Sequence, residues 1–189
     1  MNSLETTSLT CQFLIAMPSL DDRWFGQSVV FICDHKPAST FGIVINKLLD
    51  MQLGDLFDQM DLHCEDKNLC GVPIYQGGPI NAERGFVLHT QGMQWERSYD
   101  LGNGIFLTTS KDILLDLAAG KGPKNCFIAL GYASWSEGQL EHELRQNSWL
   151  NAPADETIIF HKPVDERWHA GAQLLGVDIQ LISNTVGHA

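Results

Sequence analysis

The fold of this chain is decided by the stretch Leu130-Gly131-Tyr132-Ala133-Ser134-Trp135-Ser136-Glu137-Gly138-Gln139-Leu140-Glu141-His142-Glu143-Leu144. An apolar run at 126–130 leads into it and is typical of a buried strand. Leu140 and Leu144 then have the spacing of the inner face of a helix. Ser134 with Glu137, and Ser136 with Gln139, each have the spacing of a capping box. We therefore predict a strand, a turn and a capped helix here, with either pair as the cap.

Outside this stretch, strands outnumber helices. Strands are predicted at 12–16, 28–33, 41–45, 72–75, 86–89, 105–108, 157–160 and 177–182. Helices are predicted at 54–60, between the N-cap Ser110 and the stop Gly120, and at 164–175. A short loop joins the strands at 28–33 and 41–45, which indicates a hairpin. Strands in runs as well as in alternation with helices favour an α+β fold with a mixed sheet.

Length and composition indicate one globular domain over residues 1–189. Hydrophobic residues make up 44% and charged residues 19%, but no stretch reaches the roughly 20 apolar residues of a membrane helix. Residues 1–8 carry no basic residue, and the five cysteines are an odd number. Without a signal peptide, these cysteines predict reduced thiols in the cytoplasm.

The charge balance counts against direct DNA binding. The formal net charge is -11, and the twelve basic residues are scattered from Arg23 to Arg167. A protein that grips phosphates needs Lys and Arg clustered on one face. A local basic patch is still compatible with an acidic whole, so direct DNA binding stays open as an alternative.

The turn predicted after Leu130 does not carry a hydrolase motif. A nucleophile elbow has the pattern Gly-x-Ser-x-Gly, whereas Gly131-Tyr132-Ala133-Ser134-Trp135 has Ala in the place of Ser. The free amides of a helix starting after Trp135 could bind an anion. The alternative is an ordinary capped helix with Trp135 in the core.

Histidines and cysteines offer two further candidate chemistries. His35, next to Asp34, and His89 lie at predicted strand ends, where an imidazole could act as a base. The simpler interpretation is that both are surface or hydrogen-bonded histidines. The loop from His63 to Cys70 holds a Cys/His cluster, but its spacing is not that of a standard zinc site, so a loop without metal is the simpler interpretation.

Gly77 and Gly78 are the remaining candidates for ligand contact. In Gln76-Gly77-Gly78-Pro79 the missing Cβ atoms could let backbone approach a ligand closely. The chain has neither Gly-x-Gly-x-x-Gly nor a Walker Lys-Ser pair, so this is not a nucleotide signature. A tight turn is the simpler interpretation.

A longer set of motifs follows a family pattern in its order along the chain. The motifs are Ala16-Met17-Pro18, Val29-Val30-Phe31-Ile32-Cys33-Asp34-His35, Gly42-Ile43-Val44-Ile45-Asn46-Lys47, Gly77-Gly78-Pro79, Gly85-Phe86-Val87-Leu88-His89, Thr108-Thr109-Ser110, Leu130-Gly131-Tyr132-Ala133, Trp135, Gly138-Gln139-Leu140-Glu141, Glu143-Leu144, Asn147, Trp149-Leu150 and Gly187-His188-Ala189. With these motifs the chain resembles the AlgH/YqgE family over nearly its whole length. It departs from the pattern in the loop from His63 to Cys70 and at Ser134, where Gly is common.

The resemblance implies a bacterial cytosolic protein with a complex α+β fold. It implies a mixed, branched sheet that closes partly into a small barrel and is surrounded by helices. Members of the family are often labelled transcriptional regulators, yet the family has no established activity. The resemblance therefore supplies no catalytic residue, metal ligand or cofactor.

Our leading hypothesis is a binding module, not an enzyme, for a small molecule or a protein partner, with an indirect effect on gene expression. The candidate pocket residues, all at predicted element ends, are His35, Asn46, Lys47, Gly77, Gly78, His89, Trp135 and Gln139. One alternative is an enzyme that uses His35 or His89 as a base on a small anionic substrate, with Lys47 pointing into the same cleft. The second alternative is a DNA-binding regulator with a basic face.

Overall fold

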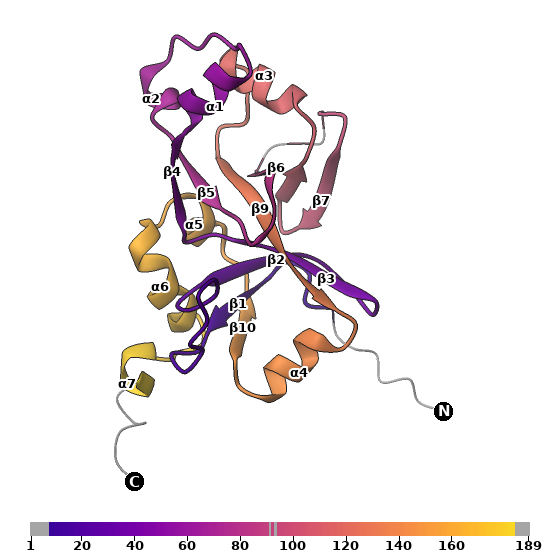
Figure 1. Cartoon of the computed structure of the whole chain (residues 1–189), viewed down its shortest axis with the longest axis vertical. Coiled ribbons are helices and arrows are strands. Elements are labelled where there is room, and N and C mark those ends of the chain that lie inside the picture. The colour runs from indigo at the N-terminus through magenta and orange to yellow at the C-terminus, as the bar shows by residue number, and fades with distance from the viewer. Residues whose placement is uncertain (1–7, 91, 93, 184–189) are drawn as a thin grey trace.

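The computed structural model describes residues 8–90, 92 and 94–183 (Figure 1), so the closing Gly187-His188-Ala189 motif lies outside the described residues. The strands are β1 (Gln12–Ala16), β2 (Val29–Lys36), β3 (Ser39–Val44), β4 (Leu48–Gln52), β5 (Pro73–Gln76), β6 (Ile80–His89), β7 (Ser98–Gly102), β8 (Ile105–Thr108), β9 (Cys126–Ser136) and β10 (Trp149–Pro153). The helices are α1 (Leu53–Gln59), α2 (Lys67–Cys70), α3 (Asp112–Ala118), α4 (Gln139–Arg145), α5 (Glu156–Phe160), the short 3-10 helix η1 (Val164–Glu166), α6 (Arg167–Gln173) and α7 (Ile179–Ser183).

The strands form one branched sheet with β9 at the branch point. The main path runs β10-β1-β2-β3-β9-β6-β8-β7, and β4 and β5 lie off this path. The first half of β9 pairs antiparallel with β6 and parallel with β5, whereas its second half pairs antiparallel with β3. The predicted α+β fold with a mixed, branched sheet is confirmed, and the sheet curls into a half-barrel.

Helices cover the curled sheet at several places. Figure 1 shows α1, α2 and α3 gathered at one end of the molecule, α4 at the other end, and α5 and α6 along one side. The predicted hairpin is present, since β2 and β3 pair antiparallel. Within the described part of the chain, no helix has the length and apolar character needed to span a bilayer.

Strand β9 changes the faces of its side chains at Gly131. Ala129 and Tyr132 pack against the same core cluster although they are three positions apart, whereas a regular strand returns to one face every two residues. Gly131 lies between them with φ 76°, and a Cβ there would lie 2.5 Å from the carbonyl oxygen of Gly78. The extra residue acts as a bulge, so Trp135 faces a second core cluster on the other side.

The predicted turn after Leu130 is wrong, because β9 continues through this stretch to Ser136. Pairing with β3, from Gly42 with Ala133 to Ser39 with Ser136, keeps the segment extended. Helix α4 begins at Gln139 after Gly138, which takes φ 72° at the N-cap without a side-chain bond. Of the two predicted capping pairs, only Ser136 and Gln139 interact, and they hold the turn before the helix.

The strands predicted at 157–160 and 177–182 are also wrong, since these segments form α5 and α7. The branched residues of both segments favour strands. At α5, however, the Asp155 carboxylate accepts from the backbone N–H of Thr157 at 2.7 Å and caps a helix that buries Ile158 and Ile159. Strands β4, β7 and β10 were not predicted.

A buried arginine fixes α6 to the sheet. Arg167 is 4% exposed and donates from Nε to the carbonyl of Lys162 at 3.0 Å and from Nη2 to the Tyr75 hydroxyl at 3.1 Å. Its Nη1 donates to the carbonyl of Ile45. Burial lowers the pKa of Arg167, and these bonds compensate for part of that cost. The Arg167 side chain therefore anchors α6 to the sheet.

Candidate functional site

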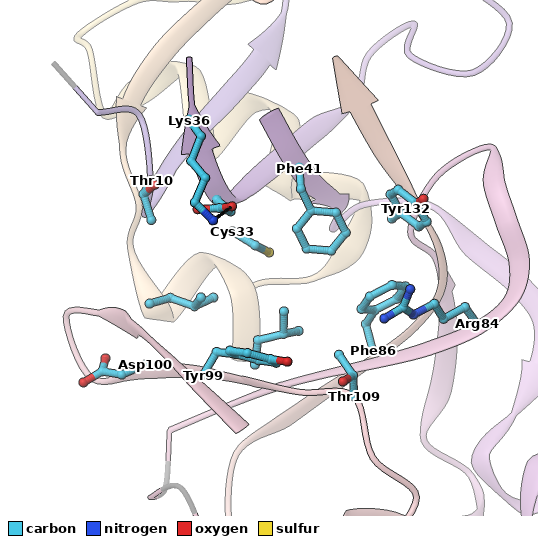
Figure 2. Close-up of a pocket in the computed structure, with 13 residues that line it drawn as sticks. Thr10, Cys33, Lys36, Phe41, Arg84, Phe86, Tyr99, Asp100, Thr109 and Tyr132 are labelled. Carbon is cyan, nitrogen blue, oxygen red and sulfur yellow. Dashed lines mark ion pairs between the residues drawn. The ribbon is translucent and has the colours of Figure 1, made fainter. Parts of the chain in front are cut away.

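A cavity of about 470 Å³ opens on the concave side of the half-barrel. Its walls come from the β2–β3 hairpin, from β6, β7, β8 and β9, and from the segments before β1 and after β8 (Figure 2). The lining residues are Thr10, Cys33, Asp34, Lys36, Phe41, Arg84, Phe86, Tyr99, Asp100, Leu101, Leu107, Thr109 and Tyr132. Cavities of this size hold small ligands in other proteins.

One wall of the cavity is aromatic. The ring centres of Phe41 and Tyr132 lie 5.2 Å apart, those of Phe41 and Phe86 5.4 Å, and those of Phe86 and Tyr132 5.7 Å. Tyr99 faces this trio across the opening and is 53% exposed. The trio forms a rigid apolar surface, and Tyr99 leaves a large aromatic face open to solvent.

Two cations and two carboxylates stand around the aromatic wall. Lys36 pairs with Asp34 at 2.7 Å, and the Asp100 carboxylate accepts from the backbone N–H of Gly102 at 2.8 Å. The Arg84 guanidinium lies 5.3 Å from the ring centre of Phe86. Among the described residues, no carboxylate is within ion-pair distance of Arg84. Arg84 is thus an exposed cation beside an aromatic face, without an anionic partner among the described residues.

Local irregularities of the strands place these side chains. In β2 the pairing with β3 shifts between Ile32 and Asp34, which brings the consecutive residues Cys33 and Asp34 to the cavity. In β6 the pairing with β9 shifts between Ile80 and Gly85, and the intervening exposed segment carries Arg84. Neither irregularity has a clear signal in the sequence.

Cys33 lines the cavity, and Figure 2 shows its sulfur pointing toward the space among the other lining side chains. It is 3% exposed, and burial raises the pKa of this thiol well above its ordinary value. A protonated thiol in this place is a weakly polar surface, not a nucleophile.

Of the predicted pocket residues, Asn46 and Lys47 brace a loop. The Asn46 side chain accepts from the backbone N–H of Val29 at 2.7 Å and donates to the carbonyl of Gln27 at 2.8 Å. Lys47 Nζ donates to the carbonyl of Trp24 at 2.6 Å. Partial burial lowers the pKa of Lys47. Both side chains hold the segment before β2 against the end of β3.

Gly77 and Gly78 serve the close approach of two protein segments. A Cβ at Gly77 would lie 2.3 Å from the carbonyl oxygen of Gly131, and one at Gly78 would lie 2.2 Å from the carbonyl carbon of Tyr132. The sequence allowed a ligand to approach these two glycines, but in the structure their neighbour is the backbone of β9.

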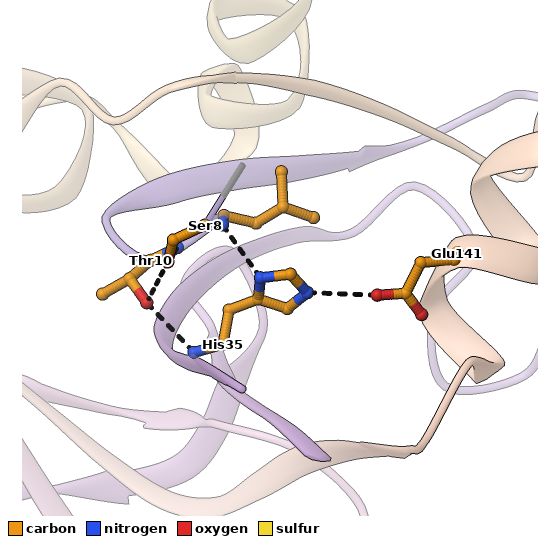
Figure 3. Close-up of polar contacts among 5 residues, drawn as sticks. Ser8, Thr10, His35 and Glu141 are labelled. Atoms are coloured by element: carbon orange, nitrogen blue, oxygen red, sulfur yellow. Dashed lines mark hydrogen bonds and ion pairs between the residues drawn. The ribbon is translucent and has the colours of Figure 1, made fainter. Parts of the chain in front are cut away.

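His35 joins the hairpin to the N-terminal segment and to α4 (Figure 3). Its Nδ1 accepts from the backbone N–H of Leu9 at 3.0 Å, so the proton of the neutral ring is on Nε2. Nε2 lies 3.2 Å from Glu141 Oε1 and donates to it. The backbone N–H of His35 donates to the Thr10 hydroxyl at 3.0 Å. Both ring nitrogens are therefore engaged in structural bonds.

His89 is enclosed in the core. It is 0% exposed, and its Nε2 lies 2.8 Å from the Thr108 hydroxyl. The ring packs edge-on against Trp95 at 4.9 Å and stacks with Phe106 at 5.8 Å. The simpler interpretation of this residue, a hydrogen-bonded core histidine, agrees with these contacts.

Trp135 and Gln139 belong to a group that we call the tryptophan cluster: Phe25, Trp135, Gln139, Glu143 and Trp149. Glu143 Oε2 accepts from the indole N–H of Trp135 at 2.9 Å and of Trp149 at 2.8 Å. Its Oε1 accepts from Gln139 Nε2 at 3.0 Å. Phe25 packs against both indoles, and Trp135 is 2% exposed. Trp135 therefore lies in the core, and its N–H is already satisfied.

None of the eight predicted pocket residues is among the residues that line this cavity. The enzyme alternative required His35, His89 and Lys47 at one cleft, and the structure places them in three separate settings. Among the described residues, no group of three or more His, Cys, Asp or Glu side chains is placed to hold a metal ion. The cavity residues were missed because they come from separate strands and share no motif.

Two solved structures have the same fold as this chain. The solution structure of the AlgH protein from Pseudomonas aeruginosa matches with a TM-score of 0.80 at 39% identity, and the match covers 100% of both chains. A crystal structure of a Corynebacterium diphtheriae protein matches with a TM-score of 0.71, covering 92% of this chain and 90% of the other. At 21% identity the second match supports the fold alone.

Sequence relatives cover the chain almost from end to end. A UPF0301 protein of Saccharophagus degradans is 48% identical over 186 residues, which are 98% of this chain and 91% of the relative. A UPF0301 protein of Thioalkalivibrio sulfidiphilus is 46% identical over 184 residues, or 97% and 98% of the two chains. The AlgH-like family model matches residues 13–180. Because family model and relatives agree over this length, the chain belongs to the AlgH-like family.

Proposed function

We propose that the protein is a binding module whose cavity receives a small, flat molecule carrying a carboxylate, sulfonate or phosphate group. The observation that carries this proposal is Arg84, an exposed cation beside Phe86 without a carboxylate partner among the described residues. A guanidinium in this state has its donors available for a bidentate bond to an anionic group.

The rest of the cavity suits the body of such a ligand. A flat apolar group can lie between Tyr99 and the trio of Phe41, Phe86 and Tyr132, where offset or edge contacts between rings are favourable. The Asp34–Lys36 pair and Asp100 add polar contacts at the rim. An apolar wall with a few convergent polar groups is the usual composition of a small-molecule site.

The proposal extends to the role of the protein. Ligand binding in this cavity would affect gene expression indirectly, through a bound metabolite or a protein partner. Direct contact with DNA is disfavoured by the net charge of -11. All five cysteines are free thiols, which fits a cytoplasmic location.

A fluorescent aromatic anion, anilinonaphthalene sulfonate, provides the test. We expect saturable binding to the wild type and about tenfold weaker binding to Arg84→Gln, because one charge-assisted bond contributes about 1.5 kcal/mol or more. Arg23→Gln is the matched control, since it removes an exposed arginine outside the cavity lining. Neutral anilinonaphthalene should bind the wild type and Arg84→Gln equally.

Chemical-shift mapping by NMR gives the location of the probe. Shifts concentrated on β7, on the β2–β3 hairpin and around Arg84 support the cavity. Equal affinity of Arg84→Gln and wild type for the sulfonate, or shifts confined to other surfaces, would overturn the proposal. If the probe binds in the cavity, a metabolite that displaces it would identify the natural ligand class.

A further inference from the structure

A pair of cysteines lies outside the cavity, in the segment between α1 and β5. Cys64 precedes the short helix α2, and Cys70 is its last residue. Asp66 caps this helix, since its carboxylate accepts from the backbone N–H groups of Asn68 and Leu69 at 2.9 and 3.3 Å. This cap orders the short segment between the two cysteines, which are six positions apart, as one compact turn.

The Cys70 thiol lies beside the backbone of Cys64. Cys70 Sγ lies 3.8 Å from the backbone carbonyl oxygen of Cys64, and Cys64 Sγ lies 3.7 Å from the carbonyl oxygen of Asp66. Both residues are half-buried. The pKa of Cys70 is raised first by the neighbouring Cys64 side chain, and then by burial and by nearby carboxylates. Cys70 therefore keeps its proton to a higher pH than an isolated thiol would.

The other cysteines have different surroundings. Cys11 and Cys33 are also close enough to interact, but they are only 8% and 3% exposed. Burial raises the pKa of Cys126 to about 11. A thiol that is enclosed reacts slowly, because a small reagent cannot reach it. Cys64 and Cys70 are thus the neighbouring thiols that a small reagent can reach.

We propose that Cys64 and Cys70 form a redox-active dithiol, which a low-molecular-weight disulfide of the glutathione type oxidises reversibly to an intramolecular disulfide. The proposal rests on the contact of the Cys70 thiol with the backbone of Cys64, on the half-burial of both residues and on the compact turn that joins them. It is independent of ligand binding in the cavity.

The exchange balances in two steps. The Cys64 thiolate attacks one sulfur of the small disulfide, the S–S bond of the reagent breaks, and its first half leaves as a thiolate that takes up a proton. The Cys70 sulfur then loses its proton and attacks the sulfur of Cys64. A Cys64–Cys70 bond forms and the second half of the reagent leaves as a thiol. Two electrons pass from the protein to the reagent, and the protein loses two hydrogen atoms.

The new bond would fix α2 to the loop before it. The far side of Cys70 contacts α1, because a Cβ at Gly54 would lie 3.1 Å from Cys70 Cβ. Oxidation would therefore restrict the loop that connects two helices at one end of the molecule. We expect a higher melting temperature for the oxidised protein, since a cross-link reduces the freedom of the unfolded chain.

The experiment equilibrates the full-length, reduced protein with reduced and oxidised glutathione without oxygen, followed by acid quenching, alkylation and mass spectrometry. The wild type should lose two hydrogen atoms and yield a cross-linked peptide that joins Cys64 to Cys70. In Cys70→Ser the second step is impossible, so a glutathione adduct should accumulate on Cys64. Cys126→Ser, the matched control, should form the cross-link as the wild type does.

Three outcomes would overturn the proposal. They are a persistent glutathione adduct on wild-type Cys64, a cross-link between Cys11 and Cys33 in place of the expected one, and no oxidation in buffers that oxidise ordinary vicinal dithiols. Thermal melts of the reduced variants check that each is folded. The wild-type result decides the matter even if a variant does not fold.

Discussion

The tryptophan cluster and the cavity lie on opposite faces of the same strand, and they differ in how their polar groups are satisfied. In the tryptophan cluster, Glu143 accepts both indole N–H groups and the Gln139 amide, so the cluster is closed on itself. In the cavity, Arg84 is unpaired among the described carboxylates and Tyr99 is 53% exposed. The polar groups of the tryptophan cluster stabilise the fold, whereas Arg84 and Tyr99 in the cavity are available to a ligand.

This difference shows why a dense motif is a poor guide to a binding site. The stretch from Leu130 to Leu144 concentrates Trp, Gly and acidic residues because a bulged strand, a left-handed turn and a half-buried carboxylate all need particular residues. A ligand surface needs only that suitable side chains converge. Substitutions that separate stability from binding should therefore distinguish the two regions.

The largest effect is expected at Gly131, on which both regions depend. Gly131→Ala would require a side chain at φ 76° and would place its Cβ 2.5 Å from the carbonyl oxygen of Gly78. We expect a loss of about 4 kcal/mol or more in the free energy of unfolding, measured by urea denaturation, because backbone strain and a backbone clash add.

Gly138→Ala is the matched control for this change. Gly138 has nearly the same φ, 72°, but a Cβ added there would have no neighbouring atom within 4 Å. It should lose only about 1 kcal/mol, the cost of the left-handed conformation itself. Equal losses in the two variants would show that the contact between β9 and Gly78 is not what requires glycine.

The next effect is expected in the tryptophan cluster. Glu143→Ala leaves the N–H groups of Trp135 and Trp149 without their acceptor, which should cost about 3 kcal/mol of stability in denaturant titrations. Glu137→Ala, an exposed carboxylate on the preceding turn, should change stability by less than about 0.5 kcal/mol. Affinity for anilinonaphthalene sulfonate should be unchanged in folded Glu143→Ala, and a large loss would mean that the two regions are coupled.

The sequence predicted much of the fold, because local patterns coincide with local structure there. The apolar runs of β2 and β3, and the stop at Gly120 after α3, each have a signal within a few residues, whereas the N-cap of α3 is Lys111 and not the predicted Ser110. The branched sheet followed from the family resemblance. The pattern was misleading at Gly131, which was predicted to start a turn but lies within a strand. It was also misleading after Asp155, where branched residues favour a strand but the cap starts helix α5.

The candidate site was not predictable in the same way. Arg84, Phe86, Tyr99 and Tyr132 come from three strands, and only the order β9-β6-β8-β7 and the curl of the sheet bring them together. The predicted residues, such as Asn46 and Gly78, carry strong local signals because they make tight structural contacts. A residue that stands out in the sequence is therefore not necessarily one whose side chain is free to bind a ligand.

A smaller effect is expected at Tyr99, and it should appear in binding and not in stability. Tyr99→Ala removes an aromatic face that is 53% exposed, so unfolding should change by less than about 0.5 kcal/mol. Affinity for the aromatic sulfonate should fall several-fold, since a pair of aromatic rings contributes about 1 kcal/mol. Leu115→Ala, which removes a side chain 50% exposed on α3, is the control that should leave affinity unchanged. A probe that binds Tyr99→Ala as well as the wild type does not use this side of the cavity.

The smallest effect is expected where the hairpin beside the cavity meets α4, at the His35–Glu141 contact. A bond from its own backbone N–H, and then the bond from His35, lower the pKa of Glu141 against the opposing effect of partial burial, and Arg145 adds to the lowering. Because the folded pKa lies below the unfolded one, the ionised carboxylate stabilises the fold above the unfolded pKa, and this contribution is lost as the pH falls through the folded pKa. Glu141→Gln still accepts from His35 and should cost less than about 1 kcal/mol at neutral pH, because the carboxylate remains partly open to solvent. The difference from the wild type should vanish in acid, and a difference that persists at low pH would assign the effect to packing instead of charge.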